Sequence, residues 1–279
     1  MREPFTDDSR EPAVMTEPCP TAFIDLARRL VDASGPVIRR YFRTPVVVDD
    51  KADHSPVTVA DREAEQAIRA ILDAERPGDG IYGEEFGTTH LDAEYVWVID
   101  PIDGTKSFIS GRPIFGTLVA LLRHGAPVLG VIDQPIIGDR WVGAAGHPTT
   151  FNGQPAHVRA CAGGLAGALL GTTSPDLFPG PDLPAFRRVQ TAAKVTVYGG
   201  DCYTYGLLAA GHCDLVVESG LKLYDFAALV PVVTGAGGFM TDWQGLPLSA
   251  ASTGQVIAAG DARTHQDTIA ALAGDFPAA

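Results

Sequence analysis

The segment YVWVIDPIDGTKSF, residues 95–108, is the stretch from which the fold and the site of this protein are best inferred. Its apolar beginning, VWVI, combines β-branched and aromatic residues, which is the pattern of a buried strand. Asp100 and Asp103 follow directly, so we expect both carboxylates at the end of that strand. Gly104 permits a left-handed turn, and Thr105 can begin a short helix. Such a turn suits a hard divalent cation and a phosphate together.

Further acidic residues resemble this pair because each lies at the edge of an apolar segment. They are Asp61, the adjacent Glu84 and Glu85, and Asp225. For any one of them, an ordinary turn with a solvated acid is an adequate explanation. An uncompensated carboxylate beside a core is costly, however, and a shared metal removes that cost. We therefore expect a convergent group of acids around divalent ions: Asp61, Glu84, Asp100, Asp103 and Asp225.

The composition indicates a soluble globular protein that does not bind nucleic acid. Hydrophobic residues make up 46% and charged residues 20% of 279, enough apolar content for a full core. The net charge of −13 opposes binding to a phosphate backbone, which requires clustered Lys and Arg. No apolar run approaches a membrane-spanning length, and the N-terminus lacks the apolar core of a signal peptide. We expect a cytoplasmic protein without a membrane partner.

The N-terminal half reads as helices followed by an antiparallel sheet. Residues 1–19 are predicted to be a flexible leader, and residues 20–158 an α+β metal-binding domain. Thr58 is a suitable N-cap for the second helix, which places Asp61 in its first turn. The expected elements are helices over 21–42 and 58–74, and strands over 96–99, 116–122, 128–132 and 140–145.

The C-terminal half alternates between strand and helix patterns. This alternation predicts an α/β domain over residues 159–279, with its loops facing the acids of the first domain across a crevice. We assign it the binding of the substrate. The expected strands span 165–170, 194–198, 215–218 and 255–259, and the expected helices span 183–193, 201–210, 225–234 and 262–273.

In order and spacing, these acidic motifs resemble the signature of the inositol monophosphatase-like, Mg²⁺-dependent phosphatase superfamily. The resemblance covers roughly residues 21–275. It implies a layered αβαβα sandwich of the inositol monophosphatase and fructose bisphosphatase type, and a homodimer. Tyr224 departs from the commonest family pattern, in which a Trp precedes the last metal-binding Asp, but the carboxylate of Asp225 is retained.

The resemblance also implies a role for each motif residue. Two or three Mg²⁺ ions, which Mn²⁺ could replace, would be bound by the side chains of Glu84, Asp100, Asp103 and Asp225 and by the carbonyl of Ile102. Asp61 and Thr105, together with Glu84, would orient and activate the attacking water. Asp103, Gly104 and Thr105 would bind the phosphate, the last two through their N–H groups. Inhibition by lithium is a further expectation from the family.

The segments around these acids are closest to the histidinol-phosphate phosphatase branch. They include SPVT at 55–58, GDCY at 200–203 and LKLYD at 221–225. Histidinol phosphate carries an ammonium and an imidazole, so its pocket should offer carboxylates beyond those that bind metal. Our candidates are Asp201 and Glu218, with Gly200 beside Asp201. Their alternative roles are an N-cap for Asp201 and a solvated strand end for Glu218.

Other activities stay open at this point. Within the same family, the chain could hydrolyse inositol 1-phosphate or, with less support, 3′-phosphoadenosine 5′-phosphate or fructose bisphosphate. A bisphosphate pocket would need added basic residues. A different class is a non-catalytic regulator that keeps the fold, but an intact set of costly clustered acids favours an enzyme.

Overall fold

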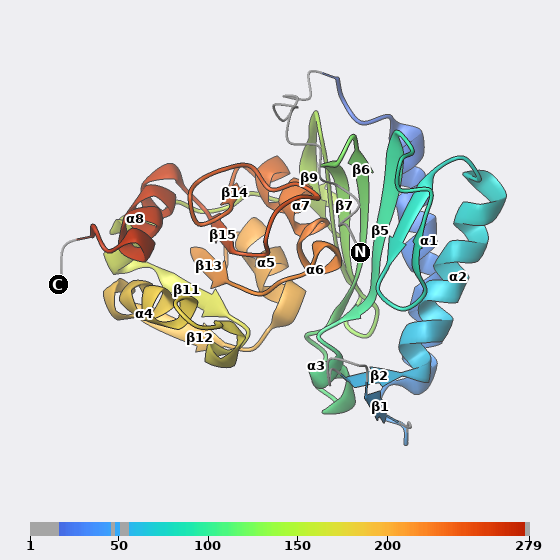
Figure 1. The fold of residues 1–279 in the computed structure, drawn as a ribbon, viewed down its shortest axis with the longest axis horizontal. Helices are drawn as coiled ribbons and strands as arrows, with labels where there is room; N and C mark the ends of the chain where they lie inside the picture. The colour runs from blue at the N-terminus through green and yellow to red at the C-terminus, as the bar shows by residue number, and fades with distance from the viewer. Residues whose placement is uncertain (1–16, 46–47, 51–55, 277–279) are drawn as a thin grey trace.

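The computed structural model describes residues 17–45, 48–50 and 56–276, and these form five alternating layers (Figure 1). Helices α1 (Thr21–Tyr41) and α2 (Val59–Glu75) form the first layer, against an eight-stranded sheet. A middle layer of helices separates that sheet from a five-stranded sheet, whose far side is covered by α4 (Asp182–Ala192) and α8 (Ala262–Ala273). The predicted αβαβα sandwich is therefore confirmed.

The first two helices begin and end within one or two residues of their predicted bounds. The Thr58 hydroxyl accepts a hydrogen bond from the Ala60 N–H, and the Asp61 carboxylate accepts one from the Thr58 N–H. This reciprocal capping box satisfies two N–H groups that would otherwise lack a partner. The apolar faces of both helices pack on the sheet around Trp97, which is fully buried.

The eight-stranded sheet has the order β10-β9-β8-β7-β6-β5-β3-β4. Its only parallel pair among the described strands is β3 with β5. Strand β5 extends past the predicted 96–99 to Asp103. A separate two-stranded hairpin pairs β1 (Val48–Asp50) with β2 (Pro56–Thr58). The strands of the large sheet are β3 (Gly80–Gly83), β4 (Gly87–Thr89), β5 (Tyr95–Asp103), β6 (Gly116–Arg123), β7 (Ala126–Gln134), β8 (Asp139–Ala144), β9 (His147–Phe151) and β10 (Gln154–Pro155).

The five-stranded sheet has the order β12-β11-β13-β15-β14 and is mixed. Strand β11 is parallel to both of its neighbours, whereas β15 is antiparallel to β13 and β14. Strand β14 was not predicted. The strands are β11 (Leu169–Thr172), β12 (Val195–Tyr198), β13 (Leu215–Glu218), β14 (Phe239–Thr241) and β15 (Val256–Ala259).

Two predicted elements of this half are only partly confirmed, because their bounds differ in the structure. The strand expected over 165–170 is instead a 3₁₀ turn, η1 (Gly164–Gly167), followed by β11. Gly164 has φ +57°, a left-handed conformation that a continuing strand does not use. The helix expected over 225–234 is two helices, α6 (Leu223–Phe226) and α7 (Leu229–Gly235). Pro231 lacks the backbone N–H that would donate to the carbonyl four residues earlier, so a single continuous helix is disfavoured.

Glycines let the middle helices lie close to the large sheet. A Cβ atom at Gly130 of β7 would lie 1.9 Å from the Ala228 carbonyl oxygen, and one at Gly143 of β8 would lie 2.2 Å from that of Pro231. The chain between α6 and α7 therefore contacts the sheet at backbone distance. This contact fixes the position of α6, whose first turn contains Asp225.

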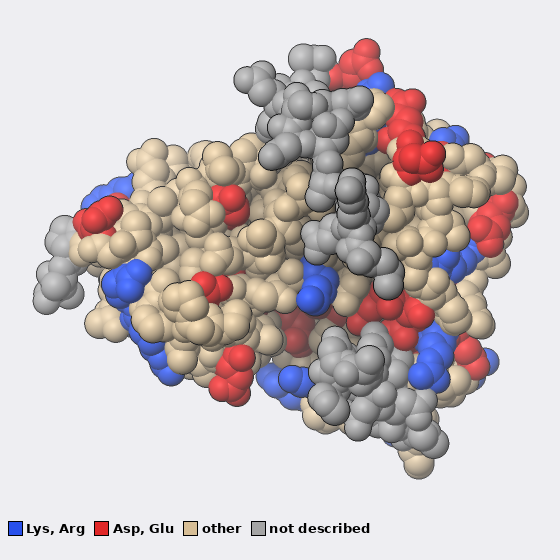
Figure 2. All heavy atoms as spheres, in the orientation of Figure 1, with Lys and Arg blue, Asp and Glu red and all other residues tan. Residues whose placement is uncertain are grey.

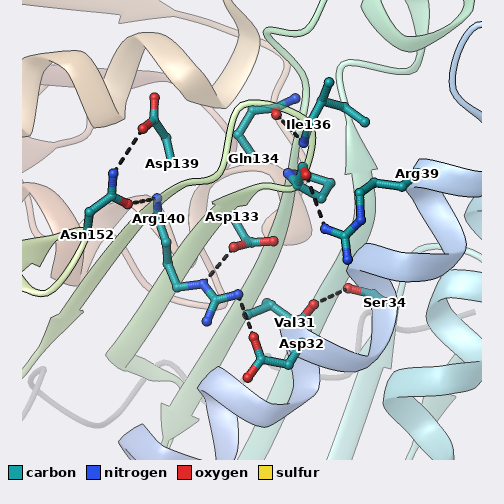
Figure 3. Close-up of polar contacts among 11 residues, drawn as sticks. Val31, Asp32, Ser34, Arg39, Asp133, Gln134, Ile136, Asp139, Arg140 and Asn152 are labelled. Atoms are coloured by element: carbon teal, nitrogen blue, oxygen red, sulfur yellow. Dashed lines mark hydrogen bonds and ion pairs between the residues drawn. The ribbon is translucent and has the colours of Figure 1, made fainter.

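Helix α5 (Asp201–Ala209) is tied to the same sheet by polar contacts. The Tyr203 hydroxyl donates to Asp139 at 2.6 Å, and the Asn152 amide donates to the other oxygen of Asp139 at 3.0 Å. Beside them, Arg140 forms ion pairs with Asp133 and with Asp32 of α1 (Figure 3). The Tyr203 hydroxyl therefore joins α5 to the start of β8.

Three predictions about the whole chain have different outcomes. Residues 1–16 of the predicted leader lie outside the described residues, while the buried Cys19 donates its N–H to the Ala145 carbonyl. The division into domains at 158/159 stays a prediction. Of the helices that the structure describes, none combines the length and apolar character needed to cross a membrane.

Candidate active site

The register of β3 and β5 brings Glu84 beside Asp100. The two strands are parallel with Gly83 opposite Ile99, and the Glu84 N–H donates to the Ile99 carbonyl at 3.1 Å. The next residue of each strand is therefore an acid at the same edge of the sheet. The charge of Glu84 accordingly acts on both Asp100 and Asp225.

The turn after β5 has the geometry expected from the sequence. Its pairing with β6 is irregular between Asp100 and Asp103, and the Ile102 N–H donates to the Asp100 carboxylate at 3.0 Å. Gly104 is left-handed at φ +86°, and the short helix α3 (Thr105–Ile109) begins immediately afterwards. The Thr105 hydroxyl donates to the Ile102 carbonyl at 3.2 Å. This hydrogen bond places the hydroxyl beside the acids.

Three of the predicted metal ligands lie together in the fold. Asp100, Asp103 and Asp225 each offer a carboxylate oxygen, and these oxygens lie within 4.8 Å of one another. The Lys222 N–H holds the Asp225 carboxylate at 2.6 Å from the start of α6. Acidic side chains gather in the hollowed centre of the face in Figure 2, between the two halves of the molecule.

The electrostatics of this cluster favour a bound cation. Burial, followed by the charges of Glu84, Asp103 and Asp225, raises the pKa of Asp100 well above its ordinary value. Burial and the neighbouring acids likewise raise the pKa of Asp103 well above normal and that of Asp225 to about 7. Repelling carboxylates at this spacing suit a hard divalent ion, which prefers oxygen ligands. The donor set therefore fits Mg²⁺ or a similar ion.

Asp61 contributes a carboxylate oxygen that has no hydrogen-bond partner in the part of the chain that the structure describes. One of its oxygens accepts hydrogen bonds from the Thr58 N–H and hydroxyl, at 2.9 and 2.6 Å. The other is buried without a hydrogen-bond partner among the described residues. Burial raises the pKa of Asp61 to about 6. A buried oxygen of this kind requires a ligand, so Asp61 is suited to accept a hydrogen bond from a water.

The start of α5 contacts the same turn from the other half of the chain. The Cys202 N–H donates to the Asp103 carboxylate at 2.6 Å. Asp201 accepts a hydrogen bond from the Ser107 hydroxyl at 2.6 Å and lies so close to Gly104 that a Cβ there would be 2.6 Å from it. The alternative role of Asp201 as an N-cap is therefore wrong. Gly200 occupies the N-cap position, and the Asp201 side chain is directed to the turn instead.

Glu218 is buried beside the cluster. It is 3% exposed, and its two oxygens accept hydrogen bonds from the Thr173 N–H at 2.8 Å and the Tyr205 hydroxyl at 2.9 Å. The alternative of a solvated strand end is therefore wrong. Burial raises the pKa of Glu218, and its charge in turn acts on Asp225. Contact between substrate and Asp201, Glu218 or Gly200 stays a prediction.

Two of these supporting residues were not predicted. Ser107 lies on α3 just after the turn, and Tyr205 lies one helical turn after Asp201 on α5. Helical spacing from a candidate residue was the available signal for Tyr205. The partner of Ser107, by contrast, is almost a hundred residues away in sequence, and no local pattern indicates that contact.

A separate groove lies away from this site. It has a volume of about 500 Å³ and runs between α1 and the strands β7, β8 and β9. Its described lining includes Arg28, Arg39, Asp133 and Arg140, and none of the predicted site residues. Both of its aspartates are paired with Arg140 (Figure 3). The groove is therefore separate from the acidic cluster.

Comparison with known proteins agrees with this geometry. The sequence profile of the inositol monophosphatase family matches residues 20–276, which is almost the whole chain. The chain belongs to that family. It is 51% identical over 259 residues to the Arabidopsis thaliana protein named bifunctional phosphatase IMPL2, chloroplastic, covering 90% of this chain and 75% of the relative. It is 37% identical to the histidinol-phosphatase of Chlorobaculum parvum, covering 81% of this chain and 87% of that one.

Solved structures of the inositol monophosphatase family share the fold. The inositol monophosphatase of Zymomonas mobilis superposes with a TM-score of 0.84 at 55% identity, covering 91% of this chain and 98% of its own. That of Anabaena gives 0.79 at 29% identity, covering 92% and 97%. Membership of this family makes the chain a phosphatase that acts on small phosphate monoesters.

Proposed function

We propose that this protein is a Mg²⁺-dependent phosphatase that hydrolyses histidinol phosphate to histidinol and phosphate through attack by an activated water. The observation that supports this substrate best is the pair of carboxylates, Asp201 and Glu218, beside the metal-binding acids. Both are held by hydrogen bonds near the acidic cluster but are not members of the close triad. A phosphate ester with a cationic alcohol would find complementary charge there.

The acidic side chains of the cluster would serve as metal ligands in the hydrolysis. Glu84, Asp100, Asp103 and Asp225 would hold two or three Mg²⁺ ions, with the Ile102 carbonyl as a further ligand. Bound Mg²⁺ supplies charge neutralisation for the phosphoryl oxygens and a lowered pKa for the attacking water. Manganese, which has similar ligand preferences, is expected to replace it.

Asp61 and Thr105 would orient the attacking water. The Asp61 oxygen that has no partner among the described residues can accept a hydrogen bond from the attacking water. The Thr105 hydroxyl lies at the turn beside Asp103. The N–H groups of Gly104 and Thr105 would donate hydrogen bonds to the phosphate oxygens, because the first N–H groups of a helix have no partner within it. No covalent nucleophile is required in this arrangement.

The named relatives support this substrate without deciding it. Two relatives at 37% and 36% identity are named histidinol-phosphatase, and the 51% relative is named a bifunctional phosphatase. The solved structure at 55% identity is named an inositol monophosphatase. Hydrolysis of inositol 1-phosphate is therefore the second candidate. We also propose that the protein forms a homodimer and that it is cytoplasmic.

A substrate panel tests the proposal directly. Purified protein with Mg²⁺ is expected to have a kcat/KM for histidinol phosphate at least about tenfold above that for inositol 1-phosphate, since a hydrogen bond to a charged group contributes about 1.5 kcal/mol. The reverse ranking would assign the chain to inositol phosphates. Release of phosphate from neither ester in the presence of Mg²⁺ would favour a regulator with the same fold.

A further inference from the structure

Glu65 is a fully buried acid that the catalytic scheme does not use. It lies on α2 one helical turn after Asp61, on the same face of the helix, and its side chain has no exposed surface. Its only described cation is Arg69, whose Nε donates to it at 2.7 Å. A buried charge is costly unless its oxygens are well bonded, so the partners of Glu65 require an explanation.

Apart from Arg69, the hydrogen-bond donors to Glu65 are backbone N–H groups of the turn that begins with Glu84. One Glu65 oxygen accepts the Glu85 N–H at 2.8 Å, and the other accepts the Phe86 N–H at 3.3 Å. Arg69 donates from its Nη2 to the Gly87 carbonyl, at the far end of the same turn. The ion pair thus binds the backbone of three consecutive residues after Glu84.

The end of β3 is shaped to admit this pair. A Cβ atom at Gly83 would lie 2.0 Å from a Glu65 oxygen and 2.6 Å from the Arg69 guanidinium. Only glycine leaves room for the buried carboxylate at this point. On the other side, the Glu84 N–H is bonded to Ile99 of β5. The backbone around Glu84 is therefore held from both sides.

We propose that Glu65, with Arg69, is a positioning residue for the metal ligand Glu84. It holds the turn over residues 85–87 in the one conformation that directs the Glu84 carboxylate at Asp100. Because Asp61 and Glu65 lie one turn apart on a single rigid helix, α2 also sets the distance between the water-orienting acid and this ligand. Partners that orient a metal ligand commonly contribute 10- to 100-fold in metal affinity, as a general range.

Metal titration of Glu65→Gln tests this inference, which rests on the proposed metal site but not on the identity of the substrate. Glutamine keeps one acceptor and loses the charge that holds Arg69. We expect Mn²⁺ binding, measured by calorimetry on the full chain, to weaken by about tenfold or more. The Mg²⁺ concentration for half-maximal activity should rise by a similar factor, while kcat at saturating Mg²⁺ stays within about threefold of wild type.

Glu63→Gln is the matched control on the same helix. Glu63 also pairs with an arginine, Arg40, and accepts a hydrogen bond from Tyr41, but on the exposed side of α2 toward α1. Its removal should leave Mn²⁺ affinity unchanged. Equal loss of affinity in both variants would overturn the inference, since a general weakening of α2 would then be the cause.

The remaining outcomes are equally decisive. A folded Glu65→Gln protein with wild-type Mn²⁺ affinity would refute the role of Glu65. If that variant does not fold, Arg69→Gln removes the same clamp from the less buried side and is expected to weaken Mn²⁺ binding in the same direction. Failure of the wild-type chain to bind Mn²⁺ at all would instead refute the proposed metal site.

Discussion

At the scale of single residues, the site depends on acids that are buried although burial is unfavourable for them. Asp100 is almost inaccessible, and the pKa values of Asp100 and Asp103 are raised well above normal by burial first and by neighbouring acids second. A purely structural role does not explain this accumulation of like charge. A divalent cation does, because it removes the repulsion that raises the pKa values.

Asp103→Asn should abolish most of the activity and leave the fold intact. Asparagine can still accept the N–H of Cys202, so α5 keeps its contact with the turn. The loss of one charged ligand should lower kcat by about 100-fold or more. Phosphate release with Mg²⁺ and a thermal melt without metal measure the two effects. Wild-type turnover in this variant would show that the metal is bound elsewhere.

Tyr205→Phe should affect the substrate that carries a positive charge. The phenol donates to Glu218, so its loss frees one carboxylate oxygen and weakens the orientation of the acid. Because Glu218 would then meet the ammonium in a less fixed orientation, the KM for histidinol phosphate should rise several-fold. The KM for p-nitrophenyl phosphate, which has no ammonium, should not change.

Tyr203→Phe is the control for that experiment. It removes the same chemical group from the same helix and also breaks a bond to a carboxylate, that of Asp139. Asp139 lies at the start of β8 and is not a member of the acidic cluster. If both variants raise the KM for histidinol phosphate equally, Glu218 has no special role in binding the substrate.

At the scale of elements, local signals predicted what local chemistry decides. Thr58 indicated the start of α2, and the capping box with Asp61 is present. The apolar run before Asp100 predicted β5, and Gly104 predicted the left-handed turn that follows it. In each case the residues that determine the conformation are adjacent in sequence, so pattern and propensity were sufficient.

Long-range packing decided what the sequence could not indicate. The apolar residues Leu165 to Leu170 suit a strand, but the structure places a 3₁₀ turn across the first half of the segment. The contact of Ala228 with Gly130 fixes where α6 ends, and that contact joins residues almost a hundred positions apart. The burial of Glu65, on the face of α2 that also carries Ile68 and Leu72, was not predicted.

The ion pair between β7 and β8 allows a test of the sheet's stability. Asp133 is 5% exposed and Arg140 is its only described cationic partner by ion pairing (Figure 3). Arg140→Met would leave a buried carboxylate unpaired and lower the free energy of unfolding by about 3 kcal/mol. Urea denaturation measures the change.

A double substitution separates charge from packing. Adding Asp133→Leu to Arg140→Met removes the stranded carboxylate and should restore about half or more of the lost stability. If the double variant is less stable than the single one, the attraction between Asp133 and Arg140 itself stabilises the sheet. The role of Arg140 would then not be limited to neutralising a buried carboxylate.

At the scale of the whole molecule, both halves contribute to one cluster. The first sheet supplies Glu84, Asp100 and Asp103, and the segment between the sheets supplies Asp225. The Cys202 N–H bridges from α5 to Asp103. Loss of the cluster's cation should therefore affect the stability of the entire fold and not only the activity.

The stability of the metal-free protein should fall as pH rises from about 5 to about 7.5. The carboxyl groups of Asp61 and Asp225 have folded pKa values of about 6 and about 7, above those of an unfolded chain. The folded state therefore binds more protons in this window, and its advantage disappears as these groups ionise. Melting temperatures in EDTA across this range measure the slope.

Added Mg²⁺ should stabilise the protein more at high pH than at low pH, which is opposite to the pH dependence of the metal-free protein. The increase in melting temperature on adding MgCl₂ should be larger at about pH 8 than at about pH 5.5, because protons compete with the ion for the same carboxylates. Sodium chloride at matched ionic strength controls for screening. A shift of equal size at both pH values would mean that the raised pKa values do not belong to metal ligands.

The central claim is that acids far apart in sequence share divalent ions at this cluster. Anomalous diffraction from crystals grown with Mn²⁺ tests it most directly. The account predicts at least one manganese peak within about 2.5 Å of carboxylate oxygens of Asp100, Asp103 and Asp225, with Glu84 at the same or a neighbouring ion. Ordered carboxylates with no manganese between them, or manganese bound only outside this cluster, would contradict it.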